Sequence, residues 1–151
     1  MRAQYHGDEQ LNSRPQQQVV TLNLPIPPSV NSAFVARHGS HRTAKSGTHL
    51  FWLRCVEEEI FALTEAHTKP LPQCNGTSYG LWIDVPAIMR GDIDNRVKLL
   101  SDILVSLKVV ADDKLMRHLY VTKAHGLQKD RCSVAVVGFS AWNDYVMMRI
   151  G

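Results

Sequence analysis

The chain has 151 residues, of which 44% are hydrophobic and 21% charged, and its formal net charge at pH 7 is +3. These values are typical of one globular domain rather than two. No run of eighteen apolar residues is present, which excludes a membrane-spanning helix, and the first ten residues lack the apolar stretch of a secretory signal. We therefore expect a cytoplasmic protein with no membrane partner.

The three cysteines, Cys55, Cys74 and Cys132, are far apart in the sequence and include no CxxC pair. An odd number at these spacings indicates neither a disulfide framework nor a zinc knuckle. Buried thiols in a reducing compartment are the expected state.

The charges are unevenly distributed along the chain. From Gln10 to Val56 there are basic residues but no acidic ones, and from Glu57 to Asp113 there are ten acidic residues against five basic ones. From Lys114 to Arg131 the balance is positive again. Basic flanks would attract a polyanion towards an acidic centre that needs cations, although chance sorting of surface charge explains the pattern equally well.

The first half of the chain predicts one strand and one helix. Residues 1–17 are polar and rich in Gln, which is typical of a disordered extension. Val19–Leu24 alternates like a strand, and Ser29–Thr48 reads as a long irregular loop. A helix is expected over Thr48–His67, with Leu53, Val56, Ile60 and Leu63 on its buried face and Glu57, Glu58 and Glu59 in solvent.

The second half predicts a strand, a helix and two more strands. The strand covers Tyr79–Ile88, and the helix covers Asp94–Leu107 with a buried stripe of Val97, Leu100, Ile103, Leu104 and Leu107. Leu115–Ala124 and Cys132–Phe139 read as a closing pair of strands, the last of them central because it is almost wholly apolar. The apolar tail, residues 140–151, is expected to pack on the body or on a second subunit.

The order strand, helix, strand, helix, strand, strand indicates an α/β protein of the mixed α+β type, a small mixed β-sheet with two main helices. We expect residues 18–139 to form the domain, with the extension before it and the tail after it.

Acidic residues gather around the second predicted helix. Asp92 and Asp94 are two residues apart, which puts both carboxylates on one side of an extended backbone. Asp94, Lys98 and Asp102 then follow at spacings of four and share one helix face. Asp112 and Asp113 come after the helix, where we expect the chain to fold back beside the helix start.

This group of side chains suits a divalent metal. Carboxylates without Cys or His match Mg²⁺, with Mn²⁺ as a substitute, better than Zn²⁺. Metal ions held in this way can activate water and hold the leaving oxygen of a phosphodiester, and Lys98 would add a fixed positive charge for the transition state. A loop of the EF-hand type is excluded, because Val97 and Ile103 stand where that motif needs Gly and Glu.

Each feature also has a purely structural explanation. An Asp at a helix start is a common N-cap, a Lys–Asp pair at i,i+4 is a common surface salt bridge, and Asp112–Asp113 is compatible with an ordinary turn. The combination of all these features favours chemistry over structure.

At these residues the sequence resembles the RusA family of Holliday junction resolvases, small homodimeric endonucleases typical of phages and prophages. The resemblance rests on Asp92-Ile93-Asp94-Asn95, Lys98, Asp102 and Asp112-Asp113, and on the upstream segment Leu24-Pro25-Ile26-Pro27-Pro28-Ser29-Val30-Asn31. It spans roughly Val19 to Phe139. One difference is that only Arg90 precedes the first Asp, where some members have a denser run of arginines.

The resemblance implies a metal site of Asp92, Asp94 and Asp113 with Lys98 as the catalytic lysine. Supporting roles fall to Asn95, to Asp102 as a residue that orients Lys98, and to Asp112 as a residue that shapes the turn. It further implies Mg²⁺ as cofactor, a homodimer, a RusA-like fold, paired nicks in four-way DNA junctions, and a bacterial or phage-infected host cell.

Basic and polar residues outside the acidic group are candidates for contact with the DNA backbone. They are Asn31, Arg37, Arg42, Lys45, Arg90, Lys114, Lys123 and Lys129. Solvated surface charge is an equally good explanation for any single lysine among them. Trp52 and Trp82 lie within apolar elements and are expected in the core rather than as stacking platforms.

Two other functions stay open on the sequence alone. One is a DNA-binding module without catalysis, which would bind branched DNA and nick nothing at any metal concentration. The other is a less selective flap or single-strand nuclease that uses the same chemistry.

Overall fold

The computed structural model describes residues 16–29, 34–36, 43–67, 71–74, 78–90 and 94–151. Four of the predicted site residues, Asn31, Arg37, Arg42 and Asp92, lie outside these ranges, as does most of the predicted extension. Gln16 and Gln17, assigned to that extension, instead form the short strand β1, which pairs in parallel with β5, Gln73–Cys74.

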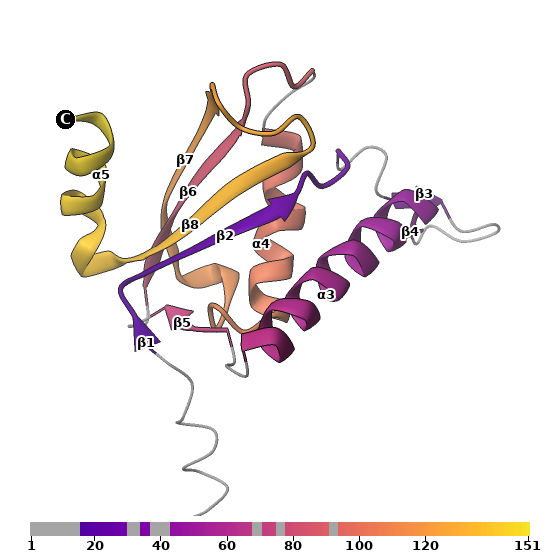
Figure 1. Cartoon of the computed structure of the whole chain (residues 1–151), viewed down its shortest axis with the longest axis horizontal. Coiled ribbons are helices and arrows are strands. Elements are labelled where there is room, and N and C mark those ends of the chain that lie inside the picture. The colour runs from indigo at the N-terminus through magenta and orange to yellow at the C-terminus, as the bar shows by residue number, and fades with distance from the viewer. Residues whose placement is uncertain (1–15, 30–33, 37–42, 68–70, 75–77, 91–93) are drawn as a thin grey trace, which may run out of the picture.

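A four-stranded mixed sheet forms the centre of the molecule (Figure 1). Its strands are β2 (Val19–Pro25), β8 (Arg131–Gly138), β6 (Tyr79–Pro86) and β7 (Met116–Ala124), in that spatial order. β8 runs antiparallel to both β2 and β6, whereas β6 and β7 are parallel. The predicted mixed α/β architecture is therefore confirmed, including the central place of the last strand.

Among the described residues, three helices pack on this sheet. α3 (Gly47–His67) and α4 (Val97–Ser106) contribute to the main core, and α5 (Trp142–Ile150) packs against the opposite face. Short 3₁₀ turns precede α4 at Asp94–Arg96, β7 at Asp113–Leu115 and α5 at Phe139–Ala141. A separate hairpin pairs β3 (Phe34–Ala36) with β4 (Thr43–Lys45). The third helix corrects the prediction of two, because the apolar tail folds as α5. No helix within the described ranges is long and apolar enough to cross a membrane.

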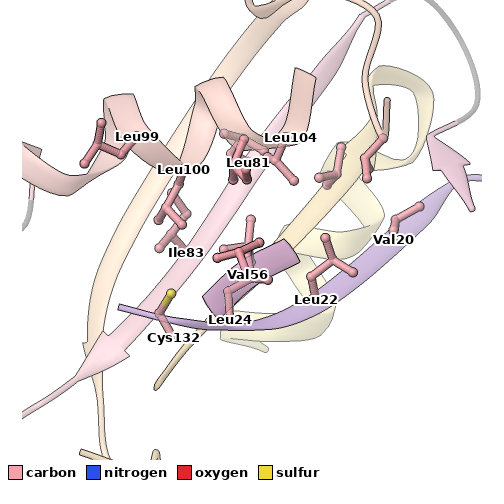
Figure 2. Close-up of a cluster of buried hydrophobic side chains, with 14 of the residues drawn as sticks. Val20, Leu22, Leu24, Val56, Leu81, Ile83, Leu99, Leu100, Leu104 and Cys132 are labelled. Atoms are coloured by element: carbon pink, nitrogen blue, oxygen red, sulfur yellow. The ribbon is translucent and has the colours of Figure 1, made fainter. Parts of the chain in front are cut away.

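The main core lies between the sheet and the pair α3 and α4 (Figure 2). Val20, Leu22 and Leu24 alternate inward along β2, as their period of two requires. The buried row of α3 steps by four through Trp52, Val56 and Ile60. Leu63 is 47% exposed, which corrects its predicted burial, because the row continues towards half-buried Thr64 instead.

The predicted closing pair of strands is not a pair. β6 lies between β7 and β8, so β7 forms an edge of the sheet. A parallel neighbour needs a crossover connection, which α4 supplies between β6 and β7. Pro86 lies beyond Asp84, the last residue of β6 that pairs with β8, so its missing N–H removes no bond from that ladder.

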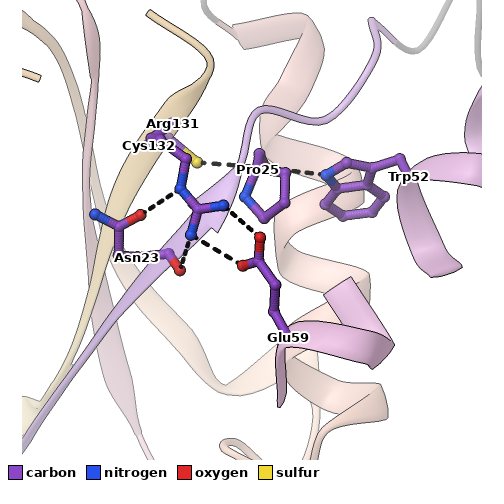
Figure 3. A network of polar contacts seen from close by, with 6 residues as sticks. All are labelled: Asn23, Pro25, Trp52, Glu59, Arg131 and Cys132. Carbon is purple, nitrogen blue, oxygen red and sulfur yellow. Dashed lines mark hydrogen bonds and ion pairs between the residues drawn. The ribbon is translucent and has the colours of Figure 1, made fainter. Parts of the chain in front are cut away.

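Arg131 fastens α3 to the sheet (Figure 3). Its guanidinium donates to both carboxylate oxygens of Glu59, at 2.5 and 2.9 Å, and to the side-chain and backbone oxygens of Asn23, at 2.7 and 3.0 Å. Trp52 Nε1 adds a bond of 2.9 Å to the carbonyl of Pro25. Glu59 is thus a structural residue and not part of a solvated face, which corrects that prediction. Trp52 and Trp82 are both 4% exposed, so their predicted place in the core is confirmed.

α5 is held on the far face of the sheet by aromatic packing and one ion pair. Trp142 lies so close to Gly80 that an added Cβ would be 2.4 Å from its ring. Arg149 Nη2 lies 2.6 Å from Asp84 Oδ2, and its guanidinium covers the Trp82 ring at 5.0 Å. Trp82 Nε1 donates to the other oxygen of Asp84 at 3.1 Å. The tail is therefore part of the folded domain.

Candidate functional site

The predicted row of charges along the second helix is present and exposed. Asp94 lies in the 3₁₀ turn before α4, and Lys98 and Asp102 follow on the helix. Lys98 Nζ is 3.7 Å from Asp102 Oδ2, with side-chain exposures of 62% and 51%. An exposed pair at this distance contributes only about 0–1 kcal/mol, so the lysine remains available to a ligand.

Asp94 does not cap the helix. The N-cap position of α4 is Arg96, which makes no side-chain capping hydrogen bond. Asp94 is exposed, two residues before that position. Asp94 therefore does not serve as the N-cap of α4. The i,i+4 salt bridge between Lys98 and Asp102, which was the structural explanation for those two residues, is present.

A groove of about 320 Å³ runs along this face of α4. Lys98, Asp102 and Ser106 form one wall, at the same spacing of four. The opposite wall comes from Lys45 and from the first turns of α3. The lining residues are Lys45, His49, Leu53, Lys98, Leu99, Asp102, Ile103 and Ser106. Sequence reasoning missed His49 and Ser106, because the contact between the two helices joins residues far apart in the chain.

Two cations fix the backbone on either side of residues 91–93. Lys123 Nζ donates to the carbonyl of Met89 at 3.1 Å. Arg96 Nη1 donates to the carbonyl of Pro27 at 3.2 Å, and its Nε contacts Met89 Sδ at 3.2 Å. Sequence reasoning missed Arg96, although it follows Asn95 directly, and it assigned Lys123 to DNA although that ammonium group already binds a carbonyl.

Asp113 lies at the other end of α4 from Asp94. It immediately precedes β7, whose first residue, Met116, pairs with Tyr79 at the start of β6, whereas Asp94 follows the end of β6. β6 has eight residues, so at 3.3 Å per residue its ends are roughly 25 Å apart. The expectation that Asp112 and Asp113 fold back beside the helix start is wrong. β7 is parallel to β6 and therefore begins beside the start of β6, whereas the segment that leads into α4 follows its end.

The surroundings of Asp112 and Asp113 agree with this placement. Asp112 Oδ1 accepts a hydrogen bond of 3.0 Å from Lys114 N–H, which holds the pKa of Asp112 below its ordinary value and matches its predicted role in the turn. Burial, with a smaller contribution from the charge of Asp113, raises the pKa of Tyr79 to about 12. Asp113 itself is exposed.

The described carboxylates do not form a complete metal site within one copy of the chain. Carboxylates are suitable ligands for Mg²⁺, but nowhere in the described part of the chain do three potential metal ligands gather in one place. Asp94 and Asp113 are too far apart to share an ion within one copy, and Asp92 lies outside the described residues.

The candidate DNA contacts do not form one patch. Arg90 and Lys123 lie near the end of β6, and Lys114 lies near its start. Lys129 occupies the turn before β8, and Lys45 lies at the groove. All five are exposed. Lys45 shares the groove with Lys98.

No protein-family model matches this chain, and no curated protein is similar enough to count as a match. The fold and the exposed charges of α4 are therefore the basis for assigning a function.

Proposed function

We propose that this protein is a metal-dependent endonuclease that resolves four-way DNA junctions by paired nicks, with the RusA-like fold and family that its motifs suggest. The observation that carries the proposal is the exposed row of Asp94, Lys98 and Asp102 beside a groove. The proposed metal ligands are Asp92, Asp94 and Asp113, and Mg²⁺ is the proposed ion.

Because Asp94 and Asp113 lie at opposite ends of α4, they can share a metal ion only if they come from different copies of the chain. α4 has ten residues and is about 15 Å long, so one copy cannot join its two ends. In the proposed homodimer, each site would therefore combine Asp94 of one copy with Asp113 of the partner subunit, and two such sites would form, one for each nick.

The residues of the chain have distinct roles in this proposal. A bound divalent ion supplies a Lewis acid and an activated water. Asp94, which is exposed and is not the N-cap residue of α4, would hold that ion through its carboxylate. The ammonium group of Lys98 lies one helical turn further on and stabilises the charge that develops on the phosphate, while Asp102, 3.7 Å away, restricts its motion.

The test is a nicking assay on a synthetic four-way junction with and without Mg²⁺. We expect Asp94→Asn and Asp113→Asn each to lower the nicking rate at least about a thousand-fold, because loss of a metal ligand removes several kcal/mol of transition-state stabilisation. Both side chains are exposed, so both variants should fold. Retained nicking by Asp94→Asn would overturn the proposed function.

A mixture of the two inactive variants tests the composite site. In a mixed dimer, one site combines both substitutions and the other combines two native aspartates, so we expect single nicks to return without paired resolution. Sites confined to one copy would leave every site in the mixture damaged and give no recovery. Absence of recovery therefore rejects the shared site while leaving the nuclease itself in place.

The alternative of a DNA-binding module without catalysis is favoured by one observation, the distance between Asp94 and Asp113. It predicts that the wild-type protein binds the junction but nicks nothing at any concentration of Mg²⁺ or Mn²⁺. The same assay separates the two functions, and linear and forked substrates test the less selective nuclease.

A further inference from the structure

The groove between α3 and α4 combines positive charge from two parts of the chain. Lys45 ends β4 and Lys98 belongs to α4, and both line the same cavity. Asp102 is the one acidic residue among the lining residues, and its carboxylate pairs with Lys98. The charge of Lys45 is therefore not balanced by a lining carboxylate, and the groove carries an excess positive charge.

The start of α3 strengthens this positive field. α3 has 21 residues and no acidic residue in its first turn. Ser46 accepts a bond of 3.1 Å from the backbone N–H of His49, which is the arrangement of a helix N-cap. The positive end of the helix dipole thus lies at the wall that Lys45 and His49 form.

The other lining residues indicate what kind of anion fits. Leu53, Leu99 and Ile103 give the groove an apolar floor beside its charged rim. A free inorganic anion would gain nothing from such a floor, whereas a nucleotide unit presents a phosphate to the rim and the carbon atoms of its sugar to the floor. A volume of about 320 Å³ holds such a unit.

We infer that this groove binds a backbone phosphate of the nucleic-acid substrate through Lys45, next to the phosphate that Lys98 contacts. The inference rests on the proposed function for the identity of the substrate. A phosphate contact at Lys45 would add a second anchoring point and fix the DNA strand along α4. His49 forms the adjacent wall of the groove: this residue is 4% exposed, and its ring is tilted against the Trp52 ring with 6.2 Å between the ring centroids.

The experiment measures the affinity for a four-way junction over a range of NaCl concentrations, with Ca²⁺ in place of Mg²⁺ to prevent nicking. We expect Lys45→Ala to weaken binding roughly five- to tenfold and to lower the slope of log K against log [salt] by about one, as the loss of one phosphate contact requires. Lys45→Arg should restore the slope. Lys108→Ala, which removes an exposed lysine outside the groove, is the matched control and should leave the slope unchanged.

The outcomes separate this inference from the proposed function. An unchanged slope in Lys45→Ala, or an equal drop in Lys108→Ala, overturns the groove inference even if wild-type protein nicks the junction. A selective drop in Lys45→Ala supports it even if no nicking is seen. Inorganic phosphate is the second probe: if it binds at millimolar concentration in a Lys45-dependent way while the DNA slope stays constant, the groove holds free phosphate and the nucleic-acid assignment is wrong.

Discussion

Two ion pairs on opposite faces of the sheet differ in length and exposure. On the α5 face, Asp84 is 8% exposed at its side chain and lies 2.6 Å from Arg149. On the α4 side, Lys98 and Asp102 are 3.7 Å apart and both more than half exposed. A short, shielded pair is strongly coupled to folding, whereas an exposed pair is weakened by water and contributes little to stability. The Asp84–Arg149 pair therefore maintains the fold, and the Lys98–Asp102 pair remains available to a ligand.

The contributions of the two ion pairs to stability are compared by replacing the acidic residue of each pair with alanine. Asp84→Ala should lower the free energy of unfolding by about 3 kcal/mol, because Arg149 and the Trp82 N–H lose their shared partner. Asp102→Ala should lower it by less than about 0.5 kcal/mol. Urea denaturation measures both values, and similar losses for the two variants would show that the faces do not differ.

Most helices and strands were predicted from the sequence, but the order of the strands in the sheet was not. Hydrophobic periodicity placed the helix that is α3 to within one residue at its start, and the apolar run of β8 indicated its central position. Periodicity is a local property, and it does not say whether β7 pairs with β8 or with β6. The expected meeting of Asp113 with Asp94 failed for this reason, because their separation depends on the strand order.

On both faces of the sheet, features set by local spacing were predictable and contacts between distant segments were not. The exposed row from Asp94 to Asp102 follows from helical spacing alone and was predicted. The groove, which brings Lys45 to Lys98, and the α5 face, which brings Asp84 to Arg149, depend on contacts between distant segments. No pattern within a short window of sequence contains that information.

Two glycines, Gly80 beneath α5 and Gly47 at the start of α3, differ in the space around them. Gly80→Ala puts a methyl group 2.4 Å from the Trp142 ring, so α5 must shift and we expect a loss of about 2 kcal/mol in unfolding free energy. Gly47→Ala, in the first turn of α3, meets nothing within 4 Å and should be neutral or stabilising by up to about 1 kcal/mol. Thermal unfolding followed by tryptophan fluorescence compares the two. A stable Gly80→Ala variant with native fluorescence would mean that α5 is not firmly packed on the sheet.

The smallest expected effect concerns pH and the core beneath α3. Burial raises the pKa of Cys132 from 9.0 to about 12, against a smaller opposing effect of the Arg131 charge. The thiol therefore stays neutral in the folded protein while the unfolded chain loses the proton, so its contribution to stability is complete below pH 9 and is lost as pH rises towards 12. Between pH 9 and pH 10 the loss should be about 1 kcal/mol, given 1.4 kcal/mol for each pH unit at the limit.

Cys132→Ala isolates this contribution by its slope rather than by its absolute stability. The variant starts from a lower free energy of unfolding, because a buried side chain has been shortened. That free energy should fall less steeply between pH 9 and 10 than in the wild type, because the contribution of Cys132 is removed while those of Cys74 and Tyr79, whose pKa values burial also raises, remain in the slope. Tyr79, whose pKa is raised from 10.0 to about 12, contributes about a third as much as the thiol between pH 9 and 10, so the variant retains a shallow slope. The exposed charges of the α4 face should not alter the slope, and Lys98→Ala, measured by urea denaturation at the same two pH values, is the control. If the wild type and Cys132→Ala lose stability in parallel, the thiol ionises as freely in the folded state as in the unfolded chain, and the core beneath α3 admits water.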